Sequence, residues 1–161
     1  MKTVKIVLAS MVAMFSVATM SAQATLQDVQ AQYNDAAAKI KAKDFVNAIV
    51  ALDKTVELGL DVPEALDVVQ QAQKYLPTCH FQVGLAAAQK GDFTAALASL
   101  NKANEMGELY GVSSAARNAK TMLSRVYTMM AAEPFNNKDY AKAAEIFAQG
   151  YAANKQDTDL A

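Results

Sequence analysis

The chain has 161 residues, of which 53% are hydrophobic, and its 15 basic side chains nearly balance its 16 acidic ones. A net charge of −1 provides no basic surface for a phosphate backbone, so we expect no nucleic-acid partner. The single cysteine, Cys79, excludes an intrachain disulfide and a cysteine-based zinc site. Few glycines and prolines, together with many alanines, favour helices.

The first 24 residues have the pattern of a secretory signal peptide. Lys2 and Lys5 accompany an apolar run over residues 6–20, and Ala22-Gln23-Ala24 supplies small residues for cleavage. The run is shorter than the roughly 20 apolar residues that a membrane-spanning helix needs. We therefore expect cleavage after Ala24, no stable membrane insertion afterwards, and a mature domain over residues 25–161 in the periplasm or outside the cell.

A pattern of Asp, an aromatic residue, Ala and a large apolar residue occurs three times with the same internal spacing. The copies are Asp44-Phe45-Ala48-Leu52, Asp92-Phe93-Ala96-Leu100 and Asp139-Tyr140-Ala143-Phe147. Asp is a good helix N-cap, and the residues after it share one helix face. A small residue eight positions before each Asp marks where a preceding helix can pack closely; these residues are Ala36, Gly84 and Ala131. Each copy therefore predicts an antiparallel helical hairpin.

The pattern predicts seven helices, near residues 26–42, 45–58, 63–76, 78–90, 93–106, 112–133 and 140–153. Asp61 and Glu64 have the spacing of a capping box, with Pro63 in the first turn of the third helix. Pro77 is expected to kink or divide the segment that leads into the second hairpin.

These hairpins resemble the tetratricopeptide repeat superfamily, with repeats near residues 29–59, 77–107 and 124–154. The second copy matches best, at Gly84, Gly91, Asp92, Phe93, Ala96, Leu100 and Ala103. Thr55 and Gly150 replace the family's second packing alanine, and Gln32, His80 and Tyr127 replace its early tryptophan. Extra helical residues lengthen the repeat beyond the usual length of about 34 residues. The chain thus resembles a secreted bacterial tetratricopeptide-like protein of long period.

The resemblance implies an all-α fold, an α-α superhelix of about three hairpins with extended connecting helices. It also implies a non-enzymatic scaffold that binds a peptide or protein surface in a concave groove lined by the first helix of each hairpin. The candidate groove residues are Tyr33, Ile40, Lys41, Phe81, Leu85, Gln89, Arg125 and Thr128. Their mixture of apolar and polar groups suits a peptide with one buried side chain and a carboxylate. The alternative is that Tyr33 and Phe81 pack against the extra helical segments and fill the groove.

The sequence contains no phosphate-binding loop, metalloprotease motif or nucleophile elbow. His80 is the one histidine, and we interpret it and Cys79 as core residues, so no catalytic, cofactor-binding or metal-binding residue is expected. The alternative function is a structural subunit of an envelope or outer-membrane complex without a free groove. The last predicted helix also has an apolar side that no later hairpin covers, which predicts self-association through the C-terminal repeat or cover by a partner.

Overall fold

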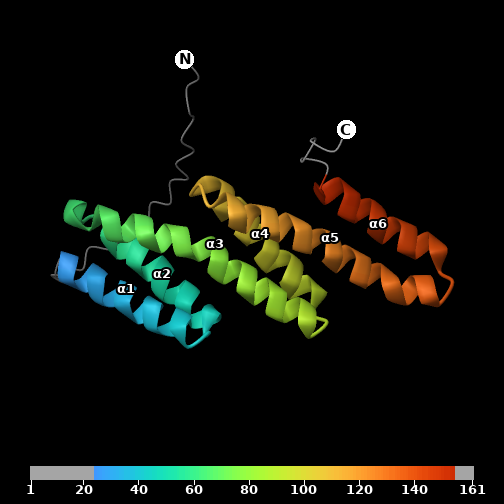
Figure 1. The fold of residues 1–161 in the computed structure, drawn as a ribbon, viewed down its shortest axis with the longest axis horizontal. Helices are drawn as coiled ribbons and strands as arrows, with labels where there is room; N and C mark the ends of the chain where they lie inside the picture. The colour runs from blue at the N-terminus through green and yellow to red at the C-terminus, as the bar shows by residue number, and fades with distance from the viewer. Residues whose placement is uncertain (1–23, 155–161) are drawn as a thin grey trace, which may run out of the picture.

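The computed structural model describes residues 24–154; the predicted leader, apart from Ala24, and residues 155–161 lie outside this range. The helices are α1 (Leu26–Lys41), α2 (Phe45–Gly59), α3 (Leu66–Gln89), α4 (Phe93–Leu109), α5 (Ser113–Asn136) and α6 (Tyr140–Asn154), with a 3-10 turn, η1 (Pro63–Ala65), before α3. Residues 24–154 contain no strand, which confirms the all-α prediction (Figure 1).

The four turns α1–α2, α3–α4, α4–α5 and α5–α6 share one backbone structure. Each contains a residue with positive φ, and the N–H of the next residue donates to a carbonyl oxygen five positions back, as Asp44 N does to Lys39 O at 2.9 Å. In three turns that next residue is the predicted aspartate, whose carboxylate caps the following helix. The carboxylates of Asp44, Asp92 and Asp139 accept hydrogen bonds from the N–H groups of Asn47, Ala95 and Lys142. The three predicted caps are confirmed.

The equivalent turn positions Lys43, Gly91 and Lys138 differ in residue type but share φ values of 60°, 79° and 63°. Left-handed backbone disfavours residues with a Cβ, so Lys43→Gly and Lys138→Gly are each expected to stabilise the protein by about 0.5–1 kcal/mol in urea unfolding. Ala42→Gly, at an adjacent right-handed position, is the control and is expected to destabilise it. An equal decrease in the free energy of unfolding from all three substitutions would contradict the shared turn structure.

Helix α3 runs unbroken through Pro77, so the expected division between residues 76 and 78 is wrong. Pro77 lacks the N–H that would bond one turn back, a defect that costs about 3 kcal/mol. Leu76 and Cys79 on either side of it are each only 1% exposed, and their burial offsets this cost. Helix α5 likewise contains a proline, Pro134, and continues past the expected end at residue 133 to Asn136.

The expected N-cap at Asp61 is also wrong. The turn η1 begins after Val62, and no side chain forms a cap hydrogen bond there. Val62 is buried in a small cluster with Val29 and Ala65, so apolar packing fixes this turn. The capping-box spacing of Asp61 and Glu64 is therefore not used as a cap.

Consecutive helices pack against one another along the chain, and α3 also contacts α1 and α5. One buried cluster joins α1, α2 and α3 around Leu52 and Leu76, and another joins α3, α4 and α5 around Leu100 and Val126. The repeated packing positions Ala36, Ala48, Ala96, Ala131 and Ala143 are buried, as the sequence predicts. The first helices α1, α3 and α5 thus form a layer in which neighbours touch.

Gly150 of α6 lies against Tyr127 of α5. A Cβ at position 150 would lie 2.8 Å from the Tyr127 Cβ, which is too close for two carbon atoms. It would also lie 2.9 Å from Tyr127 Cγ, so the Tyr127 side chain on α5 occupies the space that a larger residue on α6 would need.

Candidate functional site

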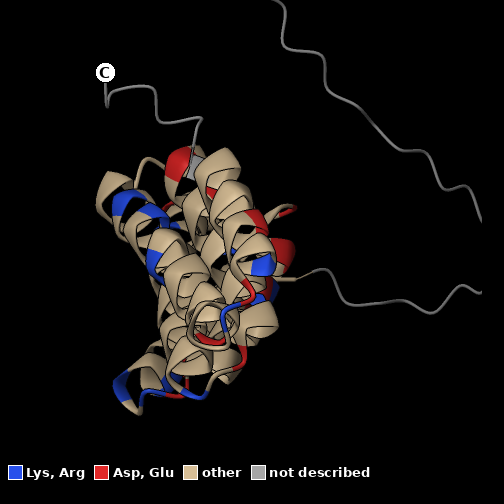
Figure 2. Ribbon diagram, turned by 90° about the vertical axis from the view of Figure 1, so that its right-hand side faces the viewer, with Lys and Arg blue, Asp and Glu red and all other residues tan. Residues whose placement is uncertain are grey.

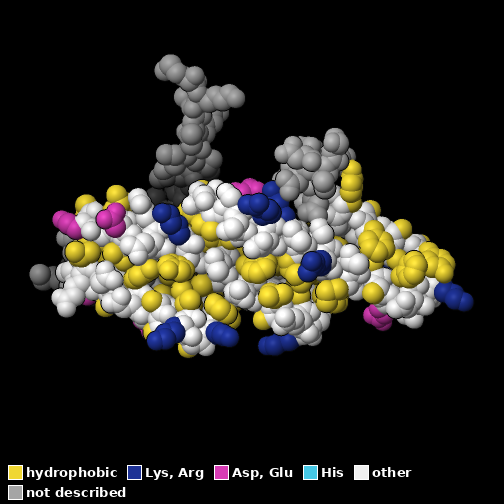
Figure 3. All heavy atoms as spheres, viewed as in Figure 1, with side chains coloured by type: hydrophobic (Ala, Val, Ile, Leu, Met, Phe, Trp, Pro, Cys, Tyr) yellow, Lys and Arg dark blue, Asp and Glu magenta, His cyan; other side chains and the backbone are white. Residues whose placement is uncertain are grey.

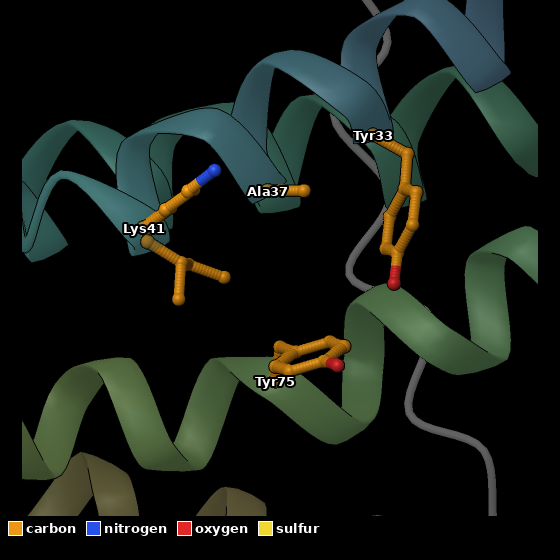
Figure 4. A pocket seen from close by; sticks show the side chains of 5 residues that line it. Tyr33, Ala37, Lys41 and Tyr75 are labelled. Atoms are coloured by element: carbon orange, nitrogen blue, oxygen red, sulfur yellow. The ribbon is translucent and has the colours of Figure 1, made fainter.

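A hollow of about 170 Å³ lies between α1 and α3, and its wall consists of Tyr33, Ala37, Ile40, Lys41 and Tyr75. Figure 4 shows the Tyr33 ring reaching from α1 toward α3, while Lys41 and Ala37 follow along the same helix. Residues 33, 37, 40 and 41 share one face of α1 because they are spaced by three or four positions. The helical period of α1 therefore places these side chains opposite Tyr75.

Tyr33 is held in place by α3. Its hydroxyl donates to Gln71 Oε1 at 3.2 Å, and its ring lies 6.4 Å from the Tyr75 ring at an interplanar angle of 51°. Burial, and secondarily the neighbouring Tyr75, raise the pKa of the Tyr33 hydroxyl above its ordinary value. The phenol is therefore neutral at pH 7 and acts as a rigid wall with one hydrogen-bonding group.

Lys41 supplies the charge at the rim of the hollow. Its side chain is exposed, and no carboxylate of residues 24–154 forms an ion pair with it, whereas Lys39 pairs with Asp35 on the same helix. Figure 2 shows charged residues of both signs separated by long uncharged stretches of helix. The ammonium group of Lys41 is therefore available to an anionic group that enters the hollow.

The structure brings together only part of the candidate groove. Tyr33, Ile40 and Lys41 line the hollow, but Phe81 packs against the second buried cluster and Leu85 is half-buried outside the hollow. Gln89, Arg125 and Thr128 are exposed and also lie outside it, and the Thr128 hydroxyl donates to the Ser124 carbonyl oxygen at 3.1 Å.

The connecting segment contributes to the hollow rather than filling it completely. Tyr75, which the sequence did not single out, lies one residue before the buried Leu76 and is 45% exposed. Helical spacing could have indicated Tyr75, because it is an aromatic residue that lies beside the apolar face of Ala72, Leu76 and Cys79 and not on it. Tyr33 does pack against this segment, as the alternative arrangement predicted, yet a hollow remains beside it.

His80 and Cys79 lie within the helical packing, away from the hollow. Burial lowers the pKa of His80, opposed by the nearby Asp53 of α2. Burial also raises the pKa of Cys79 to about 11, and its side chain is 1% exposed. The expectation that Cys79 is buried is confirmed.

The Cys79 thiol is expected to resist a disulfide-exchange reagent at pH 8, because the neutral, buried thiol reacts only when the protein opens. The rate is expected to rise with urea in step with unfolding. An exposed cysteine introduced by Ala98→Cys is the control and reacts at once. Complete reaction of Cys79 in the folded protein within seconds would contradict its burial.

A second depression, of about 300 Å³, lies between the start of α2 and the end of α3, but its Asp44 and Asp92 already cap helices. No group of three His, Cys, Asp or Glu side chains in residues 24–154 is placed to hold a metal ion. None of the helices α1 to α6 is both long enough and apolar enough to cross a membrane.

No protein-family model, curated protein or solved structure matches this chain.

Proposed function

We propose that this chain is a non-enzymatic interaction module that binds a peptide, or a peptide-like segment of a protein, in the hollow between α1 and α3. The observation that carries the proposal is the hollow itself, with two tyrosines in its wall and, at its rim, a lysine that pairs with no carboxylate of residues 24–154. In this proposal the helices form a tetratricopeptide-like superhelix, and the protein acts in the periplasm or outside the cell after loss of its leader.

The size of the hollow favours one side chain of a larger ligand. A cavity of about 150 Å³ holds a benzene molecule, whereas sites for whole small molecules are typically about 300–1,000 Å³. The hollow of about 170 Å³ therefore suits a single apolar or aromatic side chain. The rest of the ligand then lies along the surface formed by α1 and α3, as in other helical grooves.

The charge at the rim favours an acidic group beside that apolar side chain. Lys41 belongs to the last turn of α1, where it is exposed, and Ile40 next to it lines the hollow. An Asp, a Glu or a terminal carboxylate next to the apolar anchor would pair with the ammonium group. The proposed ligand is thus a peptide with one large apolar residue adjacent to a carboxylate.

The test is selection of a random peptide library displayed on phage against the purified protein. Peptides with an apolar residue beside a carboxylate are expected to be enriched, and their affinity is measured by calorimetry. Tyr75→Ala and Lys41→Glu are each expected to weaken binding about tenfold or more, because one removes a wall and the other reverses the rim charge.

Tyr140→Ala and Lys142→Glu are the matched controls, because both residues are exposed on α6. They are expected to leave the affinity of the selected peptides unchanged. Failure of any peptide to be enriched, or equal losses from the α3 and α6 substitutions, would contradict the proposal. The first outcome would instead favour the structural-subunit function.

A further inference from the structure

Helix α6 exposes a stripe whose equivalents in the earlier hairpins are covered. The stripe consists of Tyr140, Ala144, Phe147 and Tyr151, and all four residues are exposed. The equivalent residues of α2 and α4 are all buried or half-buried; they are Phe45, Ile49, Leu52 and Val56 in α2, and Phe93, Leu97, Leu100 and Asn104 in α4. Figure 3 shows hydrophobic side chains gathered over this end of the molecule. The stripe is thus an exposed packing face.

The residue that admits a following helix is missing from α6. A Cβ at Gly59 would lie 2.1 Å from Val69 Cγ2 of α3, and a Cβ at Gly107 would lie 2.8 Å from the Ala116 nitrogen of α5. Both glycines therefore allow the next helix to approach closely. The equivalent residue of α6 is Asn154, so α6 lacks the glycine at which α2 and α4 contact the next helix.

We infer that the α6 stripe is the interface of a symmetric dimer, covered by the α6 stripe of a second copy of this chain. The positions in the stripe are symmetric about its midpoint. Tyr140 and Tyr151 lie equally far from the midpoint on opposite sides, and so do Ala144 and Phe147. An antiparallel pair of α6 helices therefore places each Phe147 opposite an Ala144, a large residue against a small one.

The apolar area of this end is sufficient for such a pair. The exposed fractions of Tyr140, Phe147 and Tyr151 are 58%, 46% and 68%. Phe135 is 55% exposed, and its ring packs edge-on against Tyr140 with the ring centroids 5.6 Å apart. Burying these rings in two copies removes on the order of 900 Å² from water. With the alanines between them, this reaches the roughly 1,000 Å² that a specific interface needs.

The opposite end of the molecule favours a closed dimer over a chain of copies. The outer surface of α1 presents Gln27, Gln30 and Asn34 beside Leu26 and Ala31, and Gln30 Nε2 donates to Asn34 Oδ1 at 3.2 Å. This surface has three amide side chains and no aromatic ring, so head-to-tail stacking would bury amide groups against the rings of α6. Pairing of α6 with α6 covers both stripes and closes the assembly.

Sedimentation equilibrium of the protein, produced from the 161-residue sequence, tests the dimer. The wild type is expected to have twice the mass of one chain at micromolar concentration. Ala144→Glu is expected to weaken the dimer about tenfold or more, since it buries a carboxylate against Phe147 in both copies. Ala152→Glu, on another side of α6, is the matched control and leaves the dimer intact.

A monomeric wild type would overturn the inference, as would assemblies that grow beyond two copies with concentration. Equal effects of the two glutamate substitutions would also overturn it, because the stripe would then not be the interface. Circular dichroism checks that both variants keep the helical content of the wild type. The dimer does not depend on the hollow between α1 and α3, so Ala144→Glu is expected to bind selected peptides with unchanged intrinsic affinity.

Discussion

Leu100→Ala is expected to lower the free energy of unfolding by about 2–5 kcal/mol, a large share of the stability of a domain of this size. The Leu100 side chain is fully buried in the cluster that joins α3, α4 and α5. It also fills the space over Gly84 of α3, where an added Cβ would lie 2.7 Å from Leu100 Cγ. Removing it leaves a cavity between two helices of the central hairpin.

Leu109→Ala is the matched control, because Leu109 belongs to the same helix but is 73% exposed. It is expected to change the free energy of unfolding in urea by no more than about 0.5 kcal/mol. Similar midpoints for both variants would contradict the placement of α4 against α3.

Gly107→Leu is expected to destabilise the protein by about 3 kcal/mol, because it forces α4 and α5 apart. A Cβ at position 107 would meet backbone atoms of α5, with the Ala116 nitrogen at 2.8 Å and the Ala116 Cα at 3.1 Å. Backbone atoms cannot rotate away as the end of a side chain can, so the helices must separate.

Ala98→Leu adds the same side chain on the exposed face of α4 and is expected to change thermal unfolding by only a degree or two. If Gly107→Leu melts together with this control, the close approach of α4 and α5 is wrong. Gly107→Leu does not change Tyr33 or Tyr75, so its effect on stability can be measured separately from any effect on peptide binding.

Local signals in the sequence predicted most of the helices. The three aspartate caps and the small residues before them are short-range features, and each is found where its spacing indicates. The continuity of α3 was not predictable in this way, because burial of Leu76 and Cys79 by other helices outweighs the local effect of Pro77. The η1 turn likewise depends on contacts with Val29 from α1.

The candidate site was predictable on one helix but not across two. The resemblance to tetratricopeptide repeats indicated Tyr33, Ile40 and Lys41, and helical spacing places all three on one face of α1. Tyr75 enters the site only because α3 is continuous and passes beside α1. The sequence did not indicate that Phe81 packs against the second buried cluster, because that contact depends on how α3, α4 and α5 meet.

The most direct test of peptide binding in the hollow is an NMR titration of the isotope-labelled protein with the most enriched peptide from the phage selection. The largest chemical-shift changes are expected at Tyr33, Ala37, Ile40, Lys41 and Tyr75, which line the hollow. These changes are expected to be much smaller in Tyr75→Ala at the same peptide concentration, because the substitution weakens binding. Shifts that are largest on α6, or spread evenly over all six helices, would contradict binding between α1 and α3.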